Sequence, residues 1–217
     1  MPWLCILMER EDRINLALKI LGIFMLTMGI LIILYSLIFG HPDWIFWFCY
    51  MGMILIGIGA LTKQPLLVKT QLNILTIPLL FWIIDFFSIL FMDHSLFGIS
   101  GYFFSELNIM ARILSLEHFY LLPVGYMILF LLGESPKAWK LSVVQAAVVI
   151  FLTKILTSPA NNVNAVFSSR FNFIPNGDFY FVSLIVISFL VIVITDFVTD
   201  KLFCYYGKVT KRKIYKL

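Results

Sequence analysis

Charged residues are scarce in this chain of 217 residues. Asp, Glu, Lys and Arg make up 13% of it, and hydrophobic residues make up 61%. A soluble domain carries about 25% charged residues and is about half apolar. A water-exposed surface cannot be built from so few charges, so much of the apolar side-chain surface is predicted to face lipid. The length allows one membrane domain, 1–217, and no further soluble domain.

Cysteine is also scarce, and no spacing typical of a metal site occurs. Cys5 and Cys204 are assigned to one side of the membrane and Cys49 to the other half, so an intrachain disulfide is not expected. His with Asp or Glu suits zinc or iron, but the chain has no H-x-x-H or H-x-x-x-H. The sequence therefore predicts no metal site, and no motif names a cofactor.

Long apolar runs separated by polar breaks predict an all-α, polytopic membrane bundle of about six transmembrane helices. A membrane-spanning helix needs about 20 apolar residues, and no run alternates as a barrel strand would. The intervening segment 96–110 is aromatic and amphipathic, and is expected at the membrane interface. The six predicted spans lie near 14–39, 44–62, 71–92, 113–133, 138–157 and 179–203.

The basic residues predict the orientation. With six spans, only Arg112, Lys154 and Arg170 of the 16 Lys and Arg residues fall on the side opposite the N-terminus. Cytoplasmic loops carry the excess of positive charge, so both termini are predicted to be cytoplasmic. The net charge of +4 is thus a topology signal, and no nucleic-acid partner is expected. Membrane lipids are the expected partners, with a protein partner or homo-oligomer left open.

Ionisable and polar side chains gather in the predicted extracytoplasmic half. An ionisable group at membrane depth costs about 2.5–3.5 kcal/mol on insertion scales, so it tends to face the bundle interior. The third span supplies Asp85, and the outer end of the fifth supplies Lys154. The outer end of the fourth supplies Arg112, Ser115, Glu117 and His118.

Helical spacing predicts how the residues of the fourth span are presented. Arg112, Ser115 and His118 recur every third residue and share one helix face. Glu117 lies about 100° from His118 around a regular helix, and is predicted to meet a different neighbour.

Several interpretations of this cluster stay open. His118 and Glu117 are the candidate catalytic pair, with His118 as a general acid or base oriented by a carboxylate. The alternative is that Glu117 and His118 only form a satisfied interfacial pair. Asp85 is predicted either to line a binding pocket or to form a buried ion pair with Arg112 or Lys154.

The polar segment 157–167 supplies the last candidates. Asn162 and Asn164 offer uncharged donors and acceptors that suit a ligand's hydroxyl, amide or headgroup. The alternative is that these amides satisfy the backbone of turns and a helix cap.

Three stretches resemble an uncharacterised family of prokaryotic six-helix integral membrane proteins. They are Gly98–Phe104, Arg112–His118 followed by Leu122-Pro123, and Asn162–Phe167, within about residues 96–170. Ser100, Phe103 and Ala165 depart from the family pattern. The resemblance implies a prokaryotic cell membrane, and its motif positions add Tyr102 to the ligand-binding candidates Asp85, Arg112, Ser115, Lys154, Asn162 and Asn164. It implies no activity.

A weaker resemblance connects the chain to the androgen-induced six-helix membrane lipid hydrolases. Those enzymes also carry a His shortly before Leu-Pro in the fourth span, here His118 with Leu122-Pro123. They use an intramembrane Thr nucleophile, for which Thr76 is a candidate by residue type alone. Three function classes follow: a protein that binds or transforms a lipid or small molecule, a transporter or channel subunit with Asp85 and His118 on an ion path, and a structural partner in a membrane complex.

Overall fold

The computed structural model describes residues 2–105, 109–171, 176–177 and 179–214, and the side chains of residues 11–205 within these ranges. None of the described residues forms a strand, and the long elements are all α-helices. In chain order the helices are α1 (Pro2–Ile38), η1 (Pro42–Phe46), α2 (Phe48–Leu61), α3 (Pro65–Met92), α4 (Gly101–Ser105), α5 (Ile109–Ser115), α6 (Glu117–Leu132), α7 (Ala138–Leu156), η2 (Val163–Ala165) and α8 (Tyr180–Ile214).

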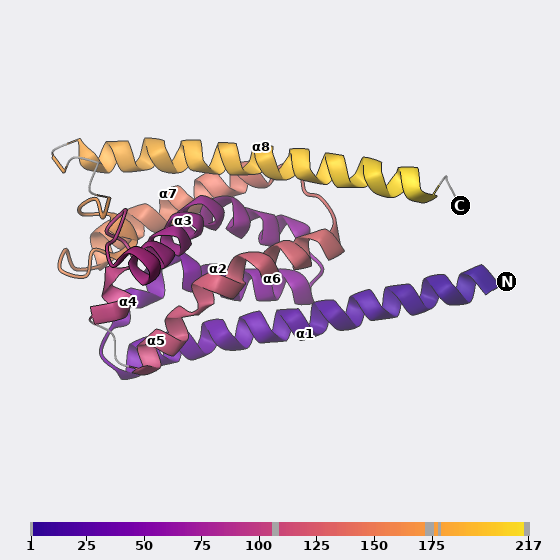
Figure 1. Ribbon diagram of the computed structural model, residues 1–217, viewed down its shortest axis with the longest axis horizontal. Coiled ribbons are helices and arrows are strands. Elements are labelled where there is room, and N and C mark those ends of the chain that lie inside the picture. The colour runs from indigo at the N-terminus through magenta and orange to yellow at the C-terminus, as the bar shows by residue number, and fades with distance from the viewer. Residues whose placement is uncertain (1, 106–108, 172–175, 178, 215–217) are drawn as a thin grey trace.

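The helices confirm the prediction of an all-α polytopic bundle. Five described segments are long and apolar enough to cross a membrane: Glu11–Ile38, Pro65–Met92, Ile109–Leu132, Ala138–Leu156 and Tyr180–Tyr205. The remaining predicted span, near 44–62, corresponds to the shorter helix α2, of 14 residues. In Figure 1 both termini lie at the same end of the bundle, as an even number of crossings requires. Which side of the membrane that end faces stays a prediction.

Helix α3 lies at the centre of the bundle and packs against α2, α6, α7 and α8. In Figure 1 the long helices α1 and α8 border the bundle on opposite sides, with the other spans between them. Large apolar side chains are exposed along both outer helices, for example Ile23 at 56% and Phe197 at 61%. Such surfaces suit contact with lipid rather than water.

The close approach of α1 and α2 fixes the position of α2. A Cβ atom added at Gly57 would lie 2.8 Å from the backbone nitrogen of Leu26 and 2.9 Å from the carbonyl oxygen of Gly22. Only a glycine fits there, because two of the clashing atoms belong to backbone. The contact packs α2 closely against α1.

A polar network fills the half of the bundle nearer the termini. Lys69 of α3 is fully buried and forms ion pairs with Asp196, at 3.2 Å, and with Asp200, both on α8. Asn73 donates to Asp196 at 2.9 Å. The side chains of Gln71 and Gln145 exchange two hydrogen bonds of 2.8 Å between α3 and α7. In the sequence, Lys69 was one of the basic residues that predict the orientation, and its burial could not be predicted because it depends on helix rotation.

Candidate functional site

The other half of the bundle holds a buried cluster of Cys49, Glu117 and His118. One ligand atom of each side chain lies within 4.8 Å of the other two. The exposed fractions are 7% for Cys49, 0% for Glu117 and 8% for His118. A thiol, a carboxylate and an imidazole thus meet in the interior of a membrane protein, contributed by the starts of α2 and α6.

The imidazole of His118 is held in one orientation. Its Nδ1 lies 2.8 Å from the carbonyl oxygen of Ser115. A carbonyl only accepts, so Nδ1 carries the proton and the other ring nitrogen, Nε2, is left as an acceptor. The indole of Trp82 stacks on the ring, with 4.2 Å between centroids and 24° between planes. His118 is therefore prepared to take a proton at Nε2.

The carboxylate of Glu117 is in an unusual situation. It is fully buried, and neither of its oxygens accepts a hydrogen bond from the residues that the structure describes. Its Oε1 lies 3.3 Å from Nδ1 of His118, which already donates to Ser115. An unsatisfied buried polar group costs about 1–3 kcal/mol, and more when charged, so the groups beside this carboxylate, the thiol of Cys49 and the imidazole of His118, are of interest.

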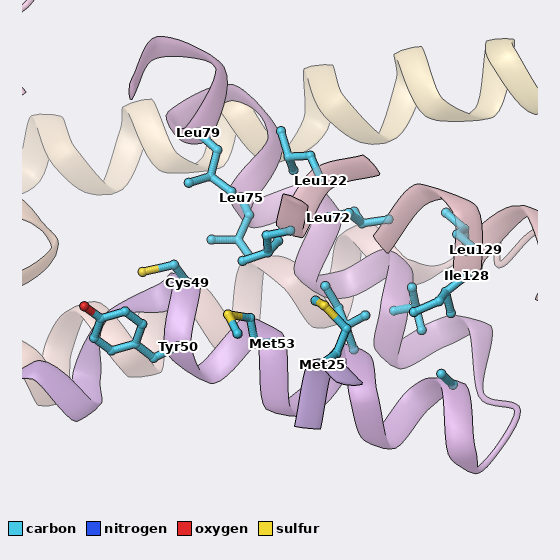
Figure 2. Close-up of a cluster of buried hydrophobic side chains, with 14 of the residues drawn as sticks. Met25, Cys49, Tyr50, Met53, Leu72, Leu75, Leu79, Leu122, Ile128 and Leu129 are labelled. Carbon is cyan, nitrogen blue, oxygen red and sulfur yellow. The ribbon is translucent and has the colours of Figure 1, made fainter. Parts of the chain in front are cut away.

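Cys49 lies in the first turn of α2, within the main hydrophobic core. Figure 2 shows it and Tyr50 near the start of α2, in the same cluster as Leu75 and Leu79 of α3. The preceding backbone is fixed by Asn164, whose amide accepts from the nitrogen of Phe48 at 3.2 Å and donates to the carbonyl of Phe46 at 2.7 Å. Asn164 therefore positions the turn that carries the thiol.

Aromatic side chains cover the cluster on the α3 and α4 side. Nε1 of Trp82 donates to the hydroxyl of Tyr102 at 3.0 Å, so the tyrosine's own proton stays available. Burial, with the nearby Glu117 carboxylate, holds the pKa of Tyr102 well above its usual value. Tyr102 is thus a hydroxyl donor at neutral pH. Rings of Phe86, Phe103 and Phe119 pack around Trp82.

Asp85 is fully buried and holds the connection between α3 and α4. Its carboxylate accepts five hydrogen bonds of 2.7–3.0 Å, three from backbone nitrogens and two from hydroxyls. The donors lie in Ser95, Phe97, Ile99 and Ser100. Neither Arg112 nor Lys154 is its partner. The geometry is that of a structural carboxylate that fixes a loop and, through it, the position of α4.

The remaining predicted site residues are used elsewhere in the described structure. Arg112 donates to the carbonyl of Phe104 at 3.0 Å. Lys154 donates to the carbonyl of Val166 at 3.3 Å and lies over the ring of Phe167 at 4.1 Å. Asn162 forms hydrogen bonds with the backbone of Phe167 and Ser168 in the loop that follows it. The backbone carbonyl of Ser115 accepts the hydrogen bond from His118. Ser115, Glu117, His118 and Tyr102 are thus brought to the cluster, and Asn164 supports it.

Glu117 meets a neighbour from another helix, Cys49 of α2, but it also lies beside His118, which regular helical spacing did not predict. The angle of about 100° between Glu117 and His118 applies to one regular helix through residues 112–118. In the structure α5 ends at Ser115 and α6 begins at Glu117. At the start of a new helix the Glu117 side chain lies beside that of His118. The hydroxyl of Thr76 donates to the carbonyl of Leu72 and lies 2.9 Å from the hydroxyl of Tyr126, and its role as a nucleophile stays a prediction.

Sequence reasoning missed Cys49 and Trp82. Both come from helices other than the one that carries His118, so no local spacing connects them with it. The only signal for Cys49 was its depth, in the same half of the membrane as His118. Comparisons with protein-family models, with curated proteins and with solved structures find no match to this chain. The two resemblances seen in the sequence stay predictions.

Proposed function

We propose that this protein is an intramembrane thiol-dependent enzyme of a prokaryotic cell membrane that transfers the acyl group of a lipid ester. The observation that carries the proposal is the meeting of Cys49, His118 and Glu117 within 4.8 Å in the interior of the bundle. A nucleophile beside a base that is itself oriented by a third group is the usual signature of covalent catalysis.

Each member of the cluster has a chemical role. The Sγ of Cys49 attacks the acyl carbonyl carbon while its proton passes to Nε2 of His118. Collapse of the intermediate breaks the ester C–O bond, and the alcohol leaves with the proton from His118. Water, activated by the same imidazole, then cleaves the thioester and releases the fatty acid and the free thiol.

The surroundings support the same chemistry. The Ser115 carbonyl and the Glu117 carboxylate both lie beside Nδ1 of His118, where they stabilise the imidazolium that forms during proton transfer. The hydroxyl of Tyr102, held by Trp82, which itself stacks on His118, is our candidate donor for the charge that develops on the acyl oxygen. A lipid substrate suits a cluster whose surroundings are apolar.

The experiment is hydrolysis of a fluorogenic long-chain fatty acyl ester by the protein purified in detergent. Cys49→Ala should reduce the rate to background, and His118→Ala should reduce it about 10²–10⁴-fold, the usual contribution of a general base. Cys204→Ala is the control, because that thiol is exposed and lies in the other half. Equal rates for wild type and Cys49→Ala would reject the proposal.

An ion path is the second candidate function, favoured by the polar network of the other half. The hydrogen bonds between Gln71 and Gln145, and from Asn73 to Asp196, join three helices near Lys69. A hollow of about 310 Å³ borders Asp196 and Asp200. Ionisable groups at this depth are typical of proton relays. A proton flux in proteoliposomes that is abolished by Asp196→Asn would support this function in place of acyl transfer.

A further inference from the structure

We propose that Cys49, Glu117 and His118 together bind one thiophilic divalent cation of the Zn²⁺ class, and that the bound ion inhibits the enzyme by occupying its thiol. The binding site is inferred from the geometry alone. The inhibition rests on the acyl transfer proposed above.

The three side chains form a donor set that suits zinc. Sulfur, nitrogen and oxygen ligands bind Zn²⁺ at about 2.0–2.3 Å, so tetrahedral ligand atoms lie about 3.3–3.7 Å apart. The three ligand atoms here lie within 4.8 Å of one another. Side-chain rotations that close the cluster by about 1 Å would complete the site, with three protein ligands and one open position.

Charge selects the class of ion. In the bound state the Cys49 thiolate and the Glu117 carboxylate carry two negative charges, and His118 is neutral. A divalent cation makes the complex neutral, which a buried site in a membrane protein requires. Mg²⁺ and Ca²⁺ prefer oxygen ligands, whereas thiolate and imidazole favour Zn²⁺ and similar ions.

Glu117 supplies an independent observation that points to a ligand. Its carboxylate is fully buried, and the polar side-chain groups beside it are the other two members of the cluster, the thiol of Cys49 and the imidazole of His118. A coordinated cation would satisfy the carboxylate oxygens. The Nδ1 of His118 bonds the Ser115 carbonyl, which is the outer-sphere contact that metal-binding histidines commonly make. With Nδ1 held by that bond, Nε2 is the ring nitrogen that would bind the ion after the side-chain rotations described above.

The test measures binding to the full chain in detergent after treatment with a chelator. Zn²⁺ titration by calorimetry should give one ion per chain, and Co²⁺ should give a thiolate charge-transfer absorption. Cys49→Ser, Glu117→Gln and His118→Gln should each weaken binding by about 100-fold or more, because loss of even an outer-sphere partner costs 10–100-fold. Cys204→Ser and His94→Ala are the controls, since both side chains are exposed and outside the cluster.

The outcomes separate this proposal from the proposed function. No stoichiometric binding, or equal binding by wild type and Cys49→Ser, would overturn the metal site even if Cys49→Ala were inactive. Ester hydrolysis that falls with Zn²⁺ and returns with chelator supports both proposals. Binding that depends on all three residues but raises the rate would support the site and overturn both the inhibition and the thiol mechanism. Unchanged thermal unfolding of Glu117→Gln shows that lost binding is not lost folding.

Discussion

At the scale of single residues, Asp85 and Glu117 present the same side-chain group in opposite situations. Both carboxylates are fully buried, but Asp85 accepts five hydrogen bonds and Glu117 accepts none from the described residues. Folding stabilises a buried acid only where its lone pairs are satisfied. Asp85 therefore contributes to stability, while Glu117 is retained at a cost that the proposed chemistry explains.

The two carboxylates should respond differently to neutralisation. Asp85→Asn replaces an acceptor oxygen with a donor that faces backbone N–H groups, and should lower the free energy of unfolding by about 1–3 kcal/mol. Glu117→Gln should leave it unchanged or raise it, because no hydrogen bond is lost. Thermal unfolding in detergent measures both, with Asp93→Asn as an exposed control. A greater loss for Glu117→Gln than for Asp85→Asn would contradict the assignment.

At the scale of elements, the site depends on contacts between helices that are distant in the chain. Asn164 of η2 holds the backbone before Cys49, and Lys69 of α3 joins two acids of α8. Hydropathy predicted the long spans, since an apolar run is a local property. The partners of each side chain depend on helix rotation, and rotation is not encoded in a pattern so uniformly apolar.

Asn164→Ala should loosen the first turn of α2. The variant leaves the nitrogen of Phe48 and the carbonyl of Phe46 without their partner, so the thiol of Cys49 should react faster with a maleimide while ester hydrolysis falls. The comparison is with Asn161→Ala, which removes an exposed hydrogen bond to Asp43. Identical maleimide rates for the two variants would argue against a positioning role for Asn164.

Lys69→Met should destabilise the bundle strongly. It leaves Asp196 and Asp200 close together without their cation, and breaking a buried pair in this way costs about 3–5 kcal/mol. Lys140→Met, at an exposed position, should have little effect. Adding Asp200→Asn to Lys69→Met should restore part of the lost stability in thermal unfolding. A Lys69→Met protein as stable as wild type would mean that the network does not hold α3 to α8.

At the scale of the whole molecule, the sequence predicted the class of fold and the end of the bundle that carries the polar candidates. Charge and hydropathy act on long segments, so they predict the spans and their orientation. The predicted pocket residues Asp85, Arg112, Lys154 and Asn162 proved to bond loops and backbone in the described structure. The irregular connections between helices contain backbone groups that need hydrogen-bond partners, and composition does not indicate which polar side chain is used for that purpose.

The orientation of the bundle is testable on intact cells. Both termini lie at one end, and the excess of Lys and Arg predicts that this end is cytoplasmic. A C-terminal cysteine-containing tag, in a Cys204→Ser background, should react with a membrane-impermeant maleimide only after the cells are opened. A cysteine placed at Asp93 should react from outside. Labelling of the C-terminal tag on intact cells would invert the topology and put the cluster in the cytoplasmic half.

The most direct measurement of the central claim is the mass of the protein after brief incubation with excess fatty acyl ester and an acid quench. The account predicts one acyl adduct per chain, mapped to Cys49, released by hydroxylamine, absent from Cys49→Ala and present in Cys204→Ala. Ester hydrolysis without an adduct on Cys49, or with the adduct on another residue, would contradict the account.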